Sequence, residues 1–247
     1  MKQKIQTLKW YDILALTVIF FGYAIYTSTL YFIQLIVQNT AEIMAPPQIS
    51  VWQNYQSLIT QLVLLAAALA YLKFRNFDFS QWSVRFSFKA VLGGIAIFII
   101  LALCMDIYYL LISPLLNNVD SAVAAQEVQT AQTTPVFDLH AKIILIIYAM
   151  LNGTYEELFF LGICLAVPPK HTLKAFIFSL LVRFGFHTYM GAYTALGLSL
   201  ICGTIYFTCY SKLNKKNLLP YFISHAFADV FGLGLYYYFY YLYYYFH

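Results

Sequence analysis

Long runs of apolar residues recur along the chain and are separated by shorter polar segments. A helix that crosses the hydrocarbon core of a bilayer needs about 20 mostly apolar residues. Seven runs are near this length, and each predicts a transmembrane helix. They are Tyr11–Val37, Val51–Leu72, Ala90–Ile112, Leu139–Val167, Leu173–Tyr189, Ala192–Tyr210 and Leu218–Tyr240. The pattern therefore predicts an all-α polytopic membrane protein.

The composition agrees with this pattern. Of the 247 residues, 62% are hydrophobic and 10% are charged, whereas soluble domains carry about 25% charged residues. So little polar surface excludes a soluble enzyme, a disordered chain and a nucleic-acid-binding module, and it makes the lipid bilayer the expected surroundings. Cys104, Cys164, Cys202 and Cys209 all lie in apolar runs without a CxxC pair. We expect them to be small buried side chains rather than disulfides or a zinc site.

The basic residues predict the orientation of the chain. If the N-terminus is cytoplasmic, all but two of the 14 lysines and arginines fall on the cytoplasmic side. They are Lys2, Lys4, Lys9, Lys73, Arg75, Arg85, Lys89, Lys170, Lys174, Lys212, Lys215 and Lys216. The outer segments 38–50, 113–138 and 190–191 contain no basic residue. Cytoplasmic loops carry the excess of Lys and Arg, so the N-terminus is predicted to be cytoplasmic.

One transmembrane domain, residues 1–247, is expected, and its first part is residues 1–138. This part holds three spans and the charged segment 74–88. In that segment Phe79, Trp82 and Phe86 recur at helical spacing. We expect the segment to lie along the cytoplasmic interface.

The last four spans lie in residues 139–235, where the polar residues gather. Residues 236–247 are nearly all Tyr and Phe. Aromatic side chains collect where the membrane meets water, so this tail is expected to anchor at the outer face.

Ionisable side chains inside spanning helices cost about 2.5–3.5 kcal/mol each, so each one is a functional candidate. The candidates are Asp106, Glu156, Glu157, Arg183, His187, His225 and Asp229. At about 1.5 Å per residue, Glu156, His187, His225 and Asp229 fall at a similar depth in the cytoplasmic half, and we expect them to meet. Asp106 lies apart and is expected to serve helix packing or the outer interface.

The cluster fits water activation. A carboxylate and a histidine can hold a water and take its proton, and a second histidine can stabilise the oxyanion that forms. The same residue types could instead ligate zinc, although no HExxH spacing is present. Glu156 and Glu157 leave the helix about 100° apart, so only one is expected to face the reacting atom, and the other needs a separate partner.

Three motifs in these residues resemble the CPBP family, named for CAAX prenyl proteases and bacteriocin-processing enzymes and also called the Abi family. The family motifs are EExxxR, then FxxxH, then HxxxN or HxxxD. In this chain residues 156–162 read EELFFLG, residues 183–187 read RFGFH and residues 225–229 read HAFAD. Order, spacing and placement on successive late helices agree, which makes residues 139–235 the CPBP-like catalytic core.

The resemblance implies an intramembrane endopeptidase whose conical helical bundle opens toward the cytoplasm. It implies Glu156 as the general base, His187 as a second holder of the water, His225 and Asp229 at the oxyanion site, and Glu157 as an orienting group. No metal is needed in that scheme, although family members are often labelled metalloproteases. The implied substrates are peptide precursors or membrane proteins, lipidated or not. The small size and the family subtype favour a bacterial plasma membrane, and the oligomeric state is not visible in the sequence.

Two positions depart from the motifs. Leu161 stands where the first motif has arginine, and Arg183 stands where the second has phenylalanine. Arg183 lies one turn from His187 on the same face, at the depth of position 161. A buried arginine needs a carboxylate partner, so we expect Arg183 to pair with Glu157 or Glu156 and to replace the missing arginine. The alternative is that Arg183 extends to the cytoplasmic interface.

Two other function classes stay open. A family member without the motif arginine could be non-catalytic and act as a scaffold or a bacteriocin-immunity protein. Buried Glu, His and Asp could also carry protons or ions in a transporter, although no inverted repeat is evident.

Overall fold

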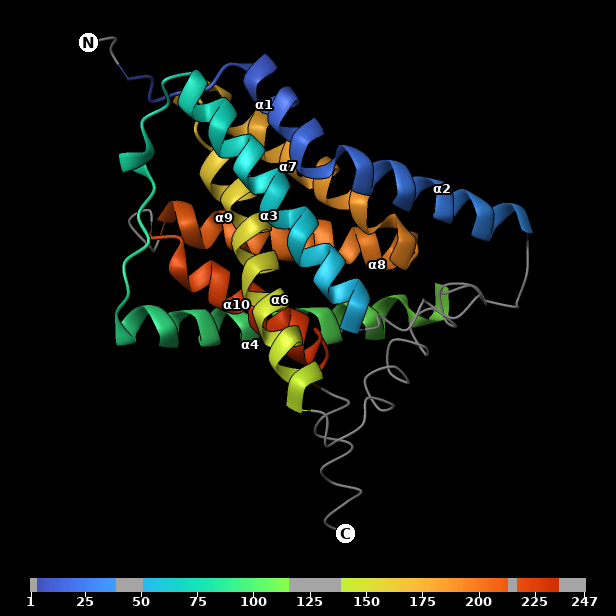
Figure 1. Ribbon diagram of the computed structural model, residues 1–247. Helices are drawn as coiled ribbons and strands as arrows, with labels where there is room; N and C mark the ends of the chain where they lie inside the picture. Colours follow the sequence, from blue (N-terminus) through green and yellow to red (C-terminus); the bar gives the residue numbers. More distant parts are fainter. Residues whose placement is uncertain (1–3, 39–50, 116–138, 213–216, 236–247) are drawn as a thin grey trace.

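The computed structural model describes the chain except for residues 1–3, 39–50, 116–138, 213–216 and 236–247 (Figure 1). Within the described residues the chain is helical, and only two isolated β-bridges occur. The long helices are α1 (Trp10–Thr17), α2 (Tyr23–Gln38), α3 (Val51–Phe74), α4 (Phe88–Ile112), α6 (Leu139–Glu157), α7 (Thr172–His187), α8 (Ala192–Gly197), α9 (Gly203–Lys212) and α10 (Leu219–Phe231). The predicted all-α architecture is confirmed for this part of the chain.

Five helices of the described residues are long and apolar enough to cross a membrane. They are Trp10–Gln34, Trp52–Phe74, Phe88–Ile112, Lys142–Ile163 and Ala192–Lys212. The chain is thus a multi-pass membrane protein, and five of the seven predicted spans meet the length and hydropathy expected of a spanning helix.

The other two predicted spans are helices below the length of a spanning helix: α7 agrees closely with its predicted range Leu173–Tyr189, and α10 is shorter than its predicted range. Helix α7 has 16 residues and α10 has 13. Helix α7 passes into a 3₁₀ turn directly after His187, and α10 stops before Gly232, whose φ of 75° is left-handed. The remainder of the predicted last span, up to Tyr240, and the aromatic tail lie largely outside the described residues. The cytoplasmic N-terminus and the conical opening stay predictions.

Three π-helical turns interrupt the spanning helices, at Val18–Gly22, Leu158–Ile163 and Leu198–Cys202. A π turn changes the helical hydrogen-bond pattern, and such turns are frequent at functional sites. A side chain from elsewhere joins each of the first two turns: Tyr155 donates its hydroxyl to the Phe20 carbonyl at 2.6 Å, and Trp82 donates its indole N–H to the Gly162 carbonyl at 3.0 Å. These bonds attach α6 to the first span and to the segment that follows α3.

An ion pair joins the start of α1 to the end of α3. Asp12 is fully buried, and its carboxylate accepts hydrogen bonds from Arg75 Nε at 2.6 Å and from the Tyr71 hydroxyl at 2.8 Å. Asp12 is missing from the predicted intramembrane charges, although it lies within the predicted span Tyr11–Val37. The pair secures the first span against the second.

The segment 74–88 departs from its helical spacing. Only Phe79–Gln81 form a 3₁₀ turn, because Trp82 turns inward to bond Gly162 while Phe86 stays exposed. Asp78 receives hydrogen bonds from Ser80 and lies near Lys4, and these contacts hold the pKa of the Asp78 carboxyl below its ordinary value. The segment is therefore largely non-helical, and its place along the cytoplasmic interface stays a prediction.

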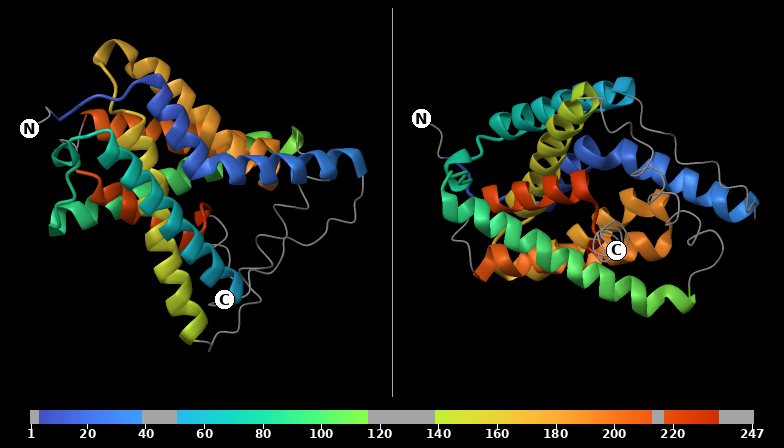
Figure 2. Two further views of the ribbon diagram at one scale, coloured as in Figure 1. Left: turned by 45° about the horizontal axis from the view of Figure 1, so that its top comes forward. Right: turned by 90° about the horizontal axis from the view of Figure 1, so that it is seen from below.

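Helix α10 lies between α4 and α6 (Figure 2). Glycines allow this close approach. A Cβ at Gly94 of α4 would lie 2.8 Å from the Pro220 carbonyl oxygen, and a Cβ at Gly153 of α6 would lie 2.8 Å from the Phe222 carbonyl oxygen. Small residues at a helix interface let two backbones come together inside a membrane. The approach at Gly153 brings α10 against the part of α6 that carries the two glutamates.

Asp106 has the structural role that was expected of it. Its carboxylate accepts the backbone N–H of Leu235 at 2.9 Å, just beyond the end of α10. The four cysteines are free, with Cys164 and Cys202 buried and Cys104 and Cys209 partly buried. No disulfide is formed, as predicted.

Candidate active site

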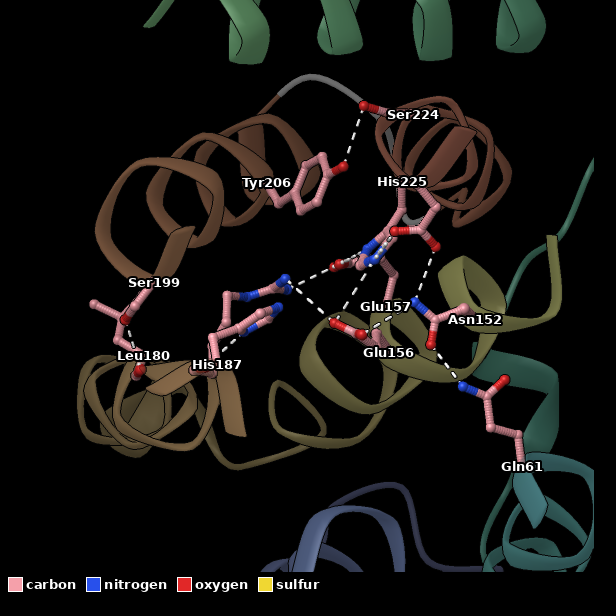
Figure 3. Close-up of polar contacts among 12 residues, drawn as sticks. Gln61, Asn152, Glu156, Glu157, Leu180, His187, Ser199, Tyr206, Ser224 and His225 are labelled. Carbon is pink, nitrogen blue, oxygen red and sulfur yellow. Dashed lines mark hydrogen bonds and ion pairs between the residues drawn. The ribbon is translucent and has the colours of Figure 1, made fainter. Parts of the chain in front are cut away.

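Glu156 and Glu157 end α6, and the π turn Leu158–Ile163 begins directly after them. Both side chains are buried, with 5% and 0% of their residue surface exposed. Figure 3 shows the two carboxylates beside His225, which α10 supplies from the facing side. Two adjacent acids buried to this degree need partners, because an isolated charge is expensive in a low-dielectric interior.

The two carboxylates meet the same imidazole ring. His225 donates from Nδ1 to Glu157 Oε1 at 2.7 Å, and His225 Nε2 lies 3.7 Å from Glu156 Oε2. Both glutamates thus contact one ring, but at opposite nitrogens, and the expectation that only one of them faces the reacting atom stays a prediction. Glutamate has a long, flexible side chain, so two residues about 100° apart on a helix can still converge when a flat ring lies between their ends.

Arg183 is paired with both glutamates. Its Nη2 donates to Glu157 Oε1 at 2.9 Å, and its Nη1 lies 3.7 Å from Glu156 Oε2. The guanidinium is 4% exposed and stacks on the Phe160 ring at 4.0 Å. The predicted contact is confirmed, and the alternative in which Arg183 extends to the interface is wrong.

His187 sits one turn from Arg183 and is held by it. Its Nδ1 lies 2.8 Å from the Arg183 carbonyl oxygen. A carbonyl only accepts hydrogen bonds, so Nδ1 must carry the proton. In the neutral ring Nε2 then has a free lone pair. His187 is therefore held in one tautomer by its own helix, and its Nε2 is the nitrogen that can serve a ligand.

Asp229 lies one turn after His225 on α10, with its Oδ1 3.6 Å from His225 Nε2. Its Oδ2 accepts a hydrogen bond from Asn152 Nδ2 at 2.9 Å. Of the four residues that were expected to meet, Glu156, His225 and Asp229 come together, and Glu157 and Arg183 join them. The fourth, His187, is attached to the cluster through Arg183.

Two neutral amides in the cluster were missed by the sequence analysis. Asn152 also donates to Glu156 Oε1 at 3.2 Å, and Gln61 of α3 donates to Asn152 Oδ1 at 2.6 Å (Figure 3). A signal existed for Asn152, since it stands one turn before Glu156 on the same helix face. Gln61 is an uncharged polar residue inside an apolar run, so the rule that singles out ionisable side chains in a span does not identify it.

The charges of the cluster do not cancel when its acids are ionised. Three carboxylates, Glu156, Glu157 and Asp229, face Arg183 and one imidazole. In addition, Glu156 Oε2 and Glu157 Oε2 are buried without a hydrogen-bond partner. The cluster therefore has capacity for a proton, a water or a cation.

A divalent metal fits part of this donor set. Glu156, Glu157 and His225 each offer a ligand atom, and these atoms lie within 4.8 Å of one another. Carboxylate oxygen and imidazole nitrogen are common zinc ligands. Arg183 and the His225 N–H already occupy Glu157 Oε1, so the available donors are Glu156 Oε2, Glu157 Oε2 and His225 Nε2.

The space between Glu156 and His225 suits a bound water. The 3.7 Å between Glu156 Oε2 and His225 Nε2 is longer than a hydrogen bond. Each atom is therefore left with capacity for a third partner. A carboxylate and an imidazole that face the same point are the groups needed to take a proton from water and to stabilise an oxyanion.

Comparison with known proteins gives one match. Residues 138–244 match the family described as type II CAAX prenyl endopeptidase Rce1-like. No curated protein and no solved structure matches the chain at a significant level. The match covers α6 to α10. It includes the six candidate residues Glu156, Glu157, Arg183, His187, His225 and Asp229, and it confirms the resemblance to the CPBP proteases. Over residues 138–244, which are less than half of the chain, this membrane protein is similar to the Rce1-like family of type II CAAX prenyl endopeptidases.

Proposed function

We propose that the protein is an intramembrane endopeptidase in which Glu156 activates a water molecule for attack on a peptide bond. One observation carries the proposal: Glu156 Oε2 is buried, has no hydrogen-bond partner and faces His225 Nε2 at 3.7 Å. A carboxylate oxygen held in this way is poised to accept a proton. The family match of the surrounding domain supports the reaction class.

The neighbouring groups would divide the remaining work. Glu157 holds the His225 ring through its Nδ1, and Arg183 in turn holds Glu157. A protonated ring can then donate from Nε2 to the oxyanion of the tetrahedral intermediate. Asp229 has no proton to donate when ionised, and its place beside Nε2 favours the charged ring. His187 Nε2 is the second acceptor that could hold the water.

A bound divalent metal would polarise the water and the scissile carbonyl as a Lewis acid. Glu156, Glu157 and His225 are the residues that would hold it. The proposed reaction does not require it, because Glu156 itself accepts the proton. Peptide precursors and membrane proteins with an accessible segment near the cytoplasmic face are the proposed substrates, and the cell membrane of a bacterium is the proposed location.

Replacing Glu156 with glutamine tests the proposal, because glutamine keeps the shape and removes the base. We expect cleavage to fall by about 10²–10⁴-fold, the usual contribution of a general base. The measurement compares the membrane proteome of cells that express the wild type or E156Q and follows any precursor that accumulates uncut. The purified protein is then tested on that precursor.

The matched control for this test is H140Q, which changes a titratable residue at the other end of α6. Retained cleavage in E156Q, or a cellular effect that survives it, would show that the chain acts as a scaffold. If a chelator abolishes wild-type activity and zinc restores it, the proposal that Glu156 acts as the base without a metal is wrong.

The proposed orientation can be tested independently of catalysis. With the N-terminus in the cytoplasm, a cysteine at Pro169, between α6 and α7, should react with a membrane-impermeant thiol reagent only from the cytoplasmic side. A cysteine at Asn117 should react only from the outer side. These variants are made in a background without the four natural cysteines, and reversed labelling would invert the topology.

A further inference from the structure

The amide of Asn152 contacts both carboxylates that face His225 Nε2. One N–H bonds Glu156 Oε1 at 3.2 Å and the other bonds Asp229 Oδ2 at 2.9 Å. The opposite oxygens of the same carboxylates, Glu156 Oε2 and Asp229 Oδ1, lie 3.7 Å and 3.6 Å from Nε2. A single amide thus engages one oxygen of each acid and leaves the other oxygen turned to the imidazole.

The orientation of this amide is set from another helix. Gln61 of α3 donates to Asn152 Oδ1 at 2.6 Å, so the Asn152 oxygen faces Gln61 and both N–H groups face the acids (Figure 3). A flipped amide would point its oxygen at two carboxylates and its N–H groups at the Gln61 donor. Gln61 Oε1 is itself buried without a partner, which is a cost that a purely structural side chain in an apolar span would avoid.

We infer that Asn152 is a positioning residue of the proposed active site: held by Gln61, it aims the free oxygens of Glu156 and Asp229 at His225 Nε2. The inference rests on the proposed function, in which Glu156 is the base. It also makes α3 part of the catalytic unit, although α3 lies outside the residues that match the Rce1-like family.

The role is tested with N152L, which has a similar size and removes both donors. We expect kcat to fall by about 10–100-fold, the usual loss when a partner that orients a functional ligand is removed. KM should change little, because a positioning residue acts through the two carboxylates that it holds. Q61L should lower kcat less, because Asn152 keeps its own donors to both acids.

A second readout does not depend on activity. The chain has five histidines, so the imidazole signals of ¹⁵N-histidine-labelled protein can be assigned by single replacement. In N152L we expect the His225 Nε2 signal to move, since both facing carboxylates are released. In Q61L the same signal should move by a smaller amount.

The matched control is Y55F, which removes a different polar contact between α3 and α6. The Tyr55 hydroxyl lies 3.0 Å from His140 Nε2, outside the cluster. This variant should shift the His140 signal and leave the His225 signal and kcat unchanged. It separates the loss of any α3–α6 hydrogen bond from the loss of this one.

The outcomes are distinct. If E156Q is inactive while N152L keeps wild-type kcat and the wild-type His225 signal, the role of Asn152 is wrong and the proposed function stands. If E156Q cleaves as well as the wild type, the proposed function is wrong, and the His225 signal alone then decides whether Asn152 positions the carboxylates. A fall in kcat in Y55F equal to that in N152L would reduce Asn152 to helix packing.

Discussion

Replacing Arg183 with leucine is expected to destabilise the folded protein by about 3–5 kcal/mol, the cost of removing one partner of a buried ion pair. The change leaves Glu157 fully buried without its arginine and removes a cation that lies 3.7 Å from Glu156 Oε2. The same change also loosens the hydrogen bond at His225 Nδ1, because Glu157, which accepts that bond, loses its own partner Arg183. Denaturant or thermal unfolding in detergent, followed together with cleavage, measures the effect.

A matched control for this prediction lies on the same helix. Lys174 is exposed, so K174M should change stability by about 0.5 kcal/mol or less. The double change R183L/E157Q should recover much of the stability, because it removes the uncompensated charge. An R183L protein that unfolds like the wild type would show that the pair does not hold the site.

Moving the arginine back to its motif position tests whether Arg183 replaces it. Leu161 and Arg183 line the same small cavity, with Phe160 and Tyr206. An arginine at 161 can therefore reach toward the same carboxylates, and L161R/R183F should retain more activity than R183F alone. Equal activities would mean that the two positions are not equivalent.

Replacing Gly153 with valine is expected to abolish cleavage. A Cβ at this position would lie 2.8 Å from the Phe222 carbonyl oxygen and 3.0 Å from His225 Cβ. Both neighbours belong to α10 close to its backbone, so α10 must move as a unit. A displacement of about 1 Å at a reacting group can cost about 10²-fold in rate, and overpacking costs about 1–3 kcal/mol of stability. Both quantities are measured on protein purified in detergent.

The control glycine lies on the other side of α10. A Cβ at Gly93 of α4 would meet only the Pro220 Cβ at 4.0 Å, which is an ordinary contact. G93A should therefore keep activity, and it should gain stability from the better helix propensity of alanine. If G153V cleaves as well as G93A, the close approach of α6 and α10 is not what places His225.

The length and hydropathy of the apolar runs predicted the helices, and helical spacing predicted that Arg183 contacts a glutamate of α6. Both are local properties, since apolar length defines a span and 3.6 residues per turn define a face. For this reason the sequence could place Arg183 beside the glutamates one turn from His187. It overestimated α10, because apolar residues continue past Gly232, where this helix ends.

The sequence by itself thus determined that the chain is a helical membrane protein and that the ionisable residues of its late helices gather in one cluster. Only the tertiary structure decided how those charges are shared: both glutamates on one imidazole, and two amides from α3 and α6 behind them. The direction of a long side chain, and the partner that crosses from another helix, depend on how closely helices approach. That approach is set by small contacts such as Gly153 against Phe222, which no periodicity along a single helix encodes.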